Sequence, residues 1–178
     1  MKEHDARPRH HWFQVAAVVR KAVSFALGVS MLTSTAWAED RAFYRKTHDG
    51  YRLPDHQATP GAIAHHDLAT ICNTKWGKDA RAVTAKMKAD AYQLYRAKKV
   101  DKQCCEVDHL ISRDVGGADE PANLWPQPWA EAHLKDRVEV EAKNRVCDGR
   151  ADLADVQRTM AEDWTRLHRE WFGVLPRK

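Results

Sequence analysis

Hydrophobic and polar positions alternate along residues 105–111, CEVDHLI, and this weak alternation with β-branched members predicts a short strand. Residues 123–126, NLWP, can return as a second strand, which we expect Pro126 to end because proline donates no ladder hydrogen bond. Gly116 and Gly117 predict a turn in the loop between the two strands. The pattern therefore predicts two short strands joined by a loop that turns at two glycines.

Two helices are predicted to follow these strands. Residues 130–147 place apolar side chains on one stripe, and Gly149 is expected to end that helix. Asp152 is expected to cap a last helix. The apolar stripes comprise Leu134, Val138, Ala142 and Val146 in the first helix and Leu153, Val156, Met160, Trp164, Leu167 and Trp171 in the second.

The region before the strands predicts one more helix and an irregular segment. Residues 79–99 repeat apolar positions at spacings of three and four, and Asp79 can cap their start. Residues 39–74 show little periodicity and are expected to form an irregular leader. We therefore expect a small α+β fold with a single domain over residues 75–178, and the sequence shows no internal repeat and no second domain.

Residues 1–38 have the organisation of a secretory signal peptide. A basic stretch comes first, residues 22–38 carry no charge, and Ala36-Trp37-Ala38 supplies a small-x-small cleavage site. The alternative is an uncleaved anchor, but the uncharged run is short and contains several Ser and Thr. We therefore expect cleavage after Ala38, a periplasmic or secreted protein, and no stable membrane association afterwards.

Removing residues 1–38 changes the charge balance. The chain holds 29 basic and 25 acidic residues, and 24 and 23 remain, so the mature protein is nearly neutral. Residues 75–102 nevertheless hold nine basic residues against three acidic ones. This local excess favours contacts with phosphates, although a solvated helix face is the alternative. The candidate substrate-binding lysines are Lys86, Lys88, Lys98 and Lys99.

All four cysteines, Cys72, Cys104, Cys105 and Cys147, lie in the exported part, which favours two disulfides. We expect the adjacent Cys104 and Cys105 not to pair with each other, because such a bond would strain the peptide between them. Cys72 would then pair with one of them and Cys147 with the other. A zinc–thiolate site is the alternative, but the sequence has no C-x-x-C spacing.

Four polar residues suit the hydrolysis of a phosphodiester bond. Histidine ionises near neutral pH and can activate water, so His109 is a candidate general base. Asp108 offers an oxygen and His133 a nitrogen to a divalent cation, which would neutralise phosphate charge. Asn123 can hold the loop in shape through its amide.

The segments EVDHLI, GG, ANLWPQP and AHLKD, in this order within residues 106–136, resemble an HNH endonuclease, the ββα-metal finger, and most of all small exported bacterial HNH proteins. The resemblance implies that His109 is the general base, that Asn123 orders the site, and that Asp108 and His133 bind one divalent metal ion. Magnesium is the first choice for that ion, with manganese, nickel or zinc as alternatives. The chain lacks the paired C-x-x-C motifs of the zinc-bearing members.

Two neighbouring residues have less definite roles. Arg137 lies one turn after His133 and is a candidate phosphate contact, with an ion pair to Glu141 as the alternative. Lys135 is about 200° around the helix from His133 and is expected to point away from the metal.

The resulting prediction is a metal-dependent endonuclease that prefers DNA to RNA and has low sequence specificity, since no separate base-reading module is visible. The alternatives are a non-catalytic nucleic-acid-binding protein with an HNH-like fold and a secreted nuclease toxin or effector. The sequence does not identify a protein partner.

Overall fold

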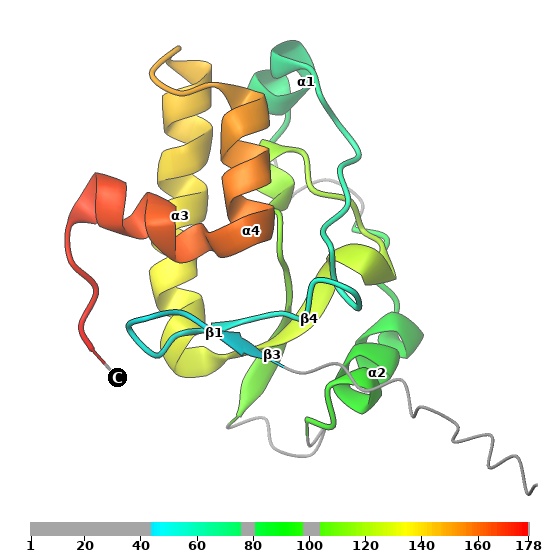
Figure 1. The fold of residues 1–178 in the computed structure, drawn as a ribbon. Helices are drawn as coiled ribbons and strands as arrows, with labels where there is room; N and C mark the ends of the chain where they lie inside the picture. Colours follow the sequence, from blue (N-terminus) through cyan, green and yellow to red (C-terminus); the bar gives the residue numbers. More distant parts are fainter. Residues whose placement is uncertain (1–43, 76–80, 98–103, 178) are drawn as a thin grey trace, which may run out of the picture. The chain divides into compact units, whose positions relative to one another are not determined.

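The computed structural model describes residues 44–75, 81–97 and 104–177, and all of them belong to a unit that spans Trp37–Lys178. This unit mixes helices with two small antiparallel sheets, so the expected α+β class is confirmed (Figure 1). The signal segment 1–38, the cap residue Asp79 and the lysines Lys98 and Lys99 lie outside the described residues.

A hairpin of β3 (Cys105–His109) and β4 (Leu124–Pro128) forms the larger ladder. Pro126 does not end β4 as expected, because it pairs with Val107 inside the strand. The backbone bonds from Leu110 N to Asn123 O and from Trp129 N to Cys104 O bracket the ladder. Hydrogen-bonded pairs alternate with non-bonded ones in an antiparallel ladder, so Pro126 and Pro128 both fall where no N–H is needed.

The two faces of β3 meet different helices. Val107 is buried with Leu124 and with Ala91 of α2 (Ala85–Leu94), whereas Asp108 contacts Lys135 of α3 (Trp129–Cys147). Figure 1 shows α2 and α3 on opposite sides of the hairpin. Successive side chains of a strand point to opposite faces, so the alternation predicted from the sequence gives each helix its own set of contacts.

Helix α2 is shorter than the predicted helix 79–99. It begins after Thr84, whose hydroxyl accepts from Met87 N while Met87 Sδ accepts from Thr84 N, and it ends before Tyr95. This reciprocal cap satisfies backbone N–H groups at the start of the helix. The helix therefore begins here, and residues 81–83 lie outside it.

Helices α3 and α4 (Leu153–Phe172) form the main core against α1 (Leu68–Asn73) and the leader. The predicted stripes are confirmed, with Leu134 and Trp171 only partly buried, and Asp152 caps α4 through Asp155 N. Among the described residues, no helix combines the length and the hydrophobicity needed to span a bilayer.

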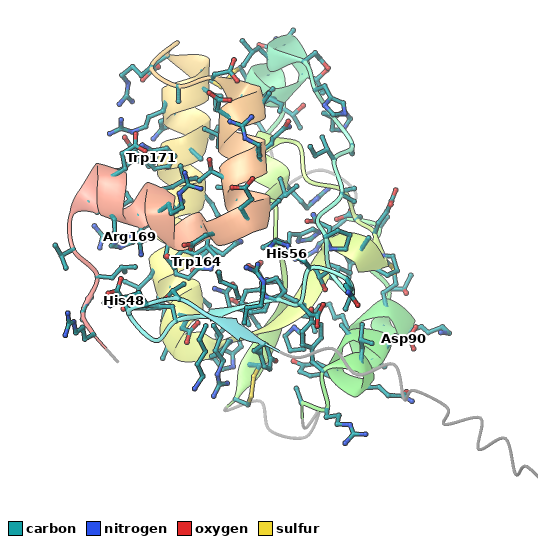
Figure 2. All side chains as sticks on the ribbon, viewed as in Figure 1. His48, His56, Asp90, Trp164, Arg169 and Trp171 are labelled. Atoms are coloured by element: carbon teal, nitrogen blue, oxygen red, sulfur yellow. A yellow bond between two sulfur atoms is a disulfide. The ribbon has the colours of Figure 1, made fainter. Side chains whose placement is uncertain are left out.

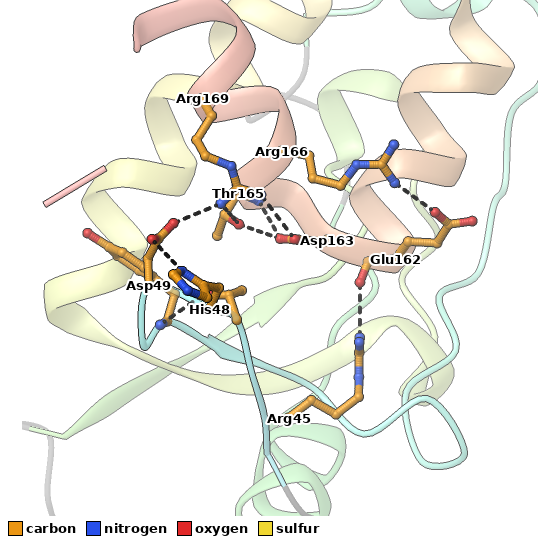
Figure 3. A network of polar contacts seen from close by, with 10 residues as sticks. Arg45, His48, Asp49, Glu162, Asp163, Thr165, Arg166 and Arg169 are labelled. Carbon is orange, nitrogen blue, oxygen red and sulfur yellow. Dashed lines mark hydrogen bonds and ion pairs between the residues drawn. The ribbon is translucent and has the colours of Figure 1, made fainter. Parts of the chain in front are cut away.

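Helix α4 bends at Asp163, whose φ of −166° and ψ of 92° are non-helical (Figure 3). The Asp163 carboxylate accepts from Thr165 N at 2.9 Å, which caps the second half of the helix. The Glu162 carbonyl, directly before the bend, accepts from Arg45 at 3.1 Å. Arg169 ties the second half to Asp163 and to Asp49. The leader is thus fastened to α4 at the bend.

The leader is more regular than the sequence predicts. It holds the two-stranded hairpin of β1 (Arg45–Lys46) and β2 (Arg52–Leu53) as well as α1. Tyr51 and Leu53 are buried in the core that α3 and α4 form, and the Tyr51 ring meets the ring of Trp164 edge-on. Strands of two residues leave too little periodicity to be recognised in the sequence.

The disulfide pairing differs from the expected one. Cys72 of α1 bonds to Cys147 at the end of α3, and the adjacent Cys104 and Cys105 bond to each other. The packing of α1 on α3 brings the Cα atoms of Cys72 and Cys147 to 5.6 Å, whereas Cys105 begins the central strand. The Cys72–Cys147 bond closes a long loop. By lowering the conformational entropy of the unfolded chain, it stabilises the fold by about 4 kcal/mol.

The loop between β3 and β4 contains two 3₁₀ turns, η1 (Arg113–Val115) and η2 (Pro121–Asn123). The predicted glycine turn lies between them. A Cβ atom on Gly117 would stand 1.8 Å from the Ile111 carbonyl oxygen, and one on Gly116, at φ +91°, would stand 2.3 Å from the His65 carbonyl oxygen. Both positions therefore require glycine for the close approach of backbone.

The contrast between Gly117 and Gly149 tests this packing. Gly117→Ala should destabilise the protein by roughly 3 kcal/mol or more, because the new methyl group meets backbone rather than a movable side chain. Gly149→Ala adds strain at φ +70° but meets nothing within 4 Å, so it should cost only about 1–2 kcal/mol. Urea unfolding of both variants measures the difference. Equal losses would contradict the close approach at Gly117.

Candidate active site at the end of strand β3

A polar cavity of about 210 Å³ opens where β3 runs into the loop. His109 is the last residue of β3 and is only 4% exposed. The polar side chains that line the cavity come from three separate segments of the chain. They are Arg81, Asp108, His109, Ser112, Arg113 and Glu139.

Both ring nitrogens of His109 have partners. Nε2 lies 2.8 Å from Asp119 Oδ1, and Nδ1 lies 3.2 Å from an Arg81 guanidinium nitrogen. A guanidinium can only donate, so Nδ1 must be the acceptor and Nε2 must carry the hydrogen that is donated to Asp119. The imidazole therefore presents its lone pair at Nδ1, on the side of the cavity.

The surroundings keep this ring neutral. Burial lowers the pKa of His109 below its usual 6.5, the hydrogen bond to Asp119 partly opposes that change, and the charge of Arg81 adds to it. Burial alone would raise the pKa of Asp119, but bonds from Ala82 N and His109 and the charge of Arg113 lower it overall. At neutral pH the pair is thus an uncharged base held by a carboxylate, which can accept a proton.

Asp119 joins three parts of the site. Besides His109, its carboxylate accepts from Arg113 Nε at 3.1 Å and from Ala82 N at 2.7 Å. Sequence reasoning missed both Asp119 and Arg81. The signal for Asp119 was its place directly after the predicted glycine turn, which returns the chain toward the end of β3. Nothing local marks Arg81, because its contact depends on how the segment before α2 crosses the loop.

Asn123 is fully buried and closes the loop. Its Oδ1 accepts from Ile111 N at 2.8 Å, and its Nδ2 donates to the carbonyls of Ile111 and Ala118 at 2.9 and 3.0 Å. One amide thus satisfies polar groups at both ends of the turn that presents Asp119. This explains why an amide is needed here, since a carboxylate could not donate.

Lys135 was expected to point away from the metal, but it points into the molecule and contacts Asp108, one of the two proposed metal ligands. Its side chain is 0% exposed and its Nζ donates to Asp108 Oδ2 at 2.8 Å, to the His109 carbonyl at 2.6 Å and to Glu139. The predicted angular separation from His133 holds, but it is His133 that faces solvent, with 76% of its side chain exposed. The predicted stripe accounts for this, because at about 100° per residue Lys135 falls between Ala142 and Val146, whereas His133 falls on the opposite face.

Two carboxylates stabilise the buried charge of Lys135. Burial would lower the pKa of Lys135, but Asp108 and Glu139 outweigh this cost and raise the pKa, so the group is an ammonium at neutral pH. Burial raises the pKa of Glu139, against the opposing effect of Lys135. One buried cation therefore serves two carboxylates and a carbonyl.

The two residues expected to bind a metal ion have other neighbours. Asp108 pairs with Lys135, while His133 Nδ1 lies 3.8 Å from Asp136 Oδ2. Burial and then repulsion from Asp108 raise the pKa values of Glu106 and Asp136. The Asp108 carboxylate suits magnesium, whereas the His133 imidazole suits zinc or nickel better. The described ranges contain no group of three His, Cys, Asp or Glu side chains placed to hold an ion, and Asp108 and His133 are already engaged with Lys135 and Asp136.

The other candidate substrate contacts lie apart from the cavity. The Arg137 guanidinium stands 4.5 Å above the centre of the Phe172 ring, and Glu141 bonds instead to Arg145 and Arg150. Lys86 and Lys88 are exposed on α2, where Lys86 pairs with Asp90 at 2.6 Å (Figure 2).

Comparison of the chain with protein-family models, with curated proteins and with solved structures finds no match. The chemistry of the site must therefore be argued from the arrangement of its own side chains.

Replacing Lys135 tests the buried charge cluster. Lys135→Met should destabilise the protein by roughly 3–5 kcal/mol, because it leaves two carboxylates beside an apolar side chain. The exposed Lys88→Met is the matched control and should change the stability by less than about 0.5 kcal/mol. Urea unfolding at pH 7 gives both values. A loss at Lys135 no larger than at Lys88 would mean that the cluster contributes nothing to stability.

The protonation of His109 can be followed directly by NMR. In the native protein the midpoint should lie below 6.5, so the contribution of this group to stability is present above 6.5 and is lost as the pH falls through the lower, folded-state pKa. Asp119→Asn removes a group that raises this pKa, so the midpoint should fall further. A midpoint that rises in the variant would contradict the assigned contact.

Proposed function

We propose that the protein is an endonuclease that hydrolyses phosphodiester bonds of nucleic acid, with DNA preferred to RNA and little sequence specificity. The observation that carries this proposal is the Nδ1 lone pair of His109, which faces a cavity lined by Arg81 and Arg113. A neutral base beside two guanidiniums suits an anionic substrate that must be attacked by water.

In the proposed reaction, water transfers a proton to His109 Nδ1 as its oxygen bonds to phosphorus. The bond from phosphorus to the leaving oxygen breaks, and that oxygen takes a proton from solvent. The imidazolium that forms is stabilised by Asp119, which already accepts the Nε2 hydrogen at 2.8 Å. Asn123 keeps the loop in place, and the guanidiniums offset charge that develops on the phosphate.

The order of the elements also supports an HNH-like interpretation. β3, β4 and α3 follow one another as strand, strand and helix, with the DH pair on the first strand and Asn123 directly before the second. The resemblance implies the same order of elements, which supports the proposal. The same resemblance proposes one divalent ion on Asp108 and His133. Since Asp108 is paired with Lys135, the proposed steps use only the side chains of the protein, and the cleavage assay in divalent ions tests metal dependence.

Substrate affinity is proposed to come partly from α2. Its exposed Lys88, together with Lys86, would contact phosphates without reading bases. Such contacts match the low specificity that we propose. The proposed setting is outside the cytoplasm, as the signal segment 1–38 predicts.

Cleavage of supercoiled plasmid and of RNA by residues 39–178 tests this function. The protein should nick DNA, and His109→Ala should reduce the rate by roughly a hundredfold to ten-thousandfold, the usual effect of losing a general base. His48→Ala is the matched control, because its side chain is 87% exposed on the leader hairpin (Figure 2). The same assay in chelator and in a series of divalent ions determines whether a metal is required.

The outcomes separate the candidate functions. Tight binding of DNA without cleavage under every ionic condition would favour the non-catalytic nucleic-acid-binding protein. Equal activity of His109→Ala and His48→Ala would remove His109 as the base. Loss of metal stimulation in His133→Ala alone would assign the ion to the helix residue that the HNH resemblance names.

A further inference from the structure

Arg81 is placed beside the base by the backbone of its own segment. The next residue, Ala82, donates its N–H to Asp119 Oδ2 at 2.7 Å, while Asp119 Oδ1 accepts from His109. One carboxylate therefore orients the imidazole and anchors the segment that carries Arg81. The contact between Arg81 and His109 follows from this shared anchor.

The guanidinium covers the atom that the proposed reaction needs. Arg81 donates to His109 Nδ1 at 3.2 Å, so its hydrogen occupies the lone pair that would take a proton from water. A single imidazole lone pair accepts one hydrogen bond at a time. Water can reach Nδ1 only when Arg81 moves away.

Arg81 has both the freedom and the charge to move toward an anion. It is exposed, whereas His109 is buried, and no carboxylate of the described residues forms an ion pair with it. The other cavity arginine, Arg113, is already paired with Asp119 at 3.1 Å. A planar guanidinium binds phosphate oxygens through two parallel hydrogen bonds, which a neutral imidazole nitrogen cannot offer.

We propose that Arg81 is a phosphate-sensing gate on the base. In the free protein it blocks His109 Nδ1, and a phosphodiester draws it away, which admits water and aligns the phosphate in one movement. This inference rests on the proposed function, since it assigns substrate selection at the same site. The gate makes the base available only when an anionic diester is present.

A binding experiment without turnover tests the gate. Dimethyl phosphate is titrated into protein labelled with ¹⁵N-histidine at pH 7.5, and the Nδ1 resonance of His109 is followed. In the native protein, saturating dimethyl phosphate should shift this resonance as Arg81 leaves. In Arg81→Gln the resonance should start near the shifted position and change little. Arg158→Gln, at an exposed site on α4, should behave as the native protein does.

Kinetics supply the second readout. Arg81→Gln should raise KM by roughly ten- to hundredfold, as expected for loss of a charge-assisted hydrogen bond, while kcat changes only a few-fold because the base is no longer blocked. Arg81→Lys should recover part of the KM, since it keeps the charge without the planar fork.

Two results would overturn the gate. One is a His109 resonance that dimethyl phosphate leaves unmoved in the native protein, or that it moves equally in Arg81→Gln. The other is a kcat that falls in Arg81→Gln as far as in His109→Ala with KM unchanged. The titration needs no cleavage, so a protein that cleaves no nucleic acid but shows the Arg81-dependent shift would refute the nuclease and keep the anion-sensing gate.

Discussion

The ammonium group of Lys135 holds helix α3 against strand β3, and the geometry of the site depends on it. Removing a cation from water costs several kcal/mol, and this cost is met only because two carboxylates and the His109 carbonyl surround the nitrogen. The bond to that carbonyl fixes the backbone of the base itself. The position of the imidazole is therefore set by two contacts. Lys135 of α3 holds the His109 backbone, and Asp119 holds the His109 ring.

Strand β3 separates two charged environments, one on each of its faces. Asp108 faces α3, where its charge is neutralised internally, and His109 faces the loop, where its partners are a carboxylate and an exposed arginine. Because neighbouring residues on a strand point to opposite faces, one dipeptide can contribute to stability on one side and to chemistry on the other. Asn123 bonds to the backbone of Ile111 and so holds the loop at the end of β3.

Local signals in the sequence predicted the elements well and the contacts poorly. Gly149 and Asp152 marked the junction of α3 and α4 correctly, because caps act within a few residues. The contacts of Lys135 with Asp108 and the His109 carbonyl could not be predicted in this way, since these groups lie on a separate strand. Asp119 reaches His109 through the path of the loop and Arg81 through the segment before α2, and the Cys72–Cys147 pair follows from the packing of α1 on α3. Pro126 and Pro128 lie inside β4 although proline was expected to end the strand. Proline is tolerated there because its missing N–H would have no acceptor on β3.

The bond between Cys72 and Cys147 gives the chain the topology of a ring with two tails. The ring contains α2, both strands of the central hairpin and α3, hence every side chain assigned to the site, while the leader hairpin and α4 lie on the tails. A protease that cuts one peptide bond inside the ring opens it but releases no fragment. A cut outside the ring sheds a tail. In a protease-rich environment, loss of mass from a single cut would therefore be confined to the packing elements, and the residues around His109 would stay on one covalent molecule.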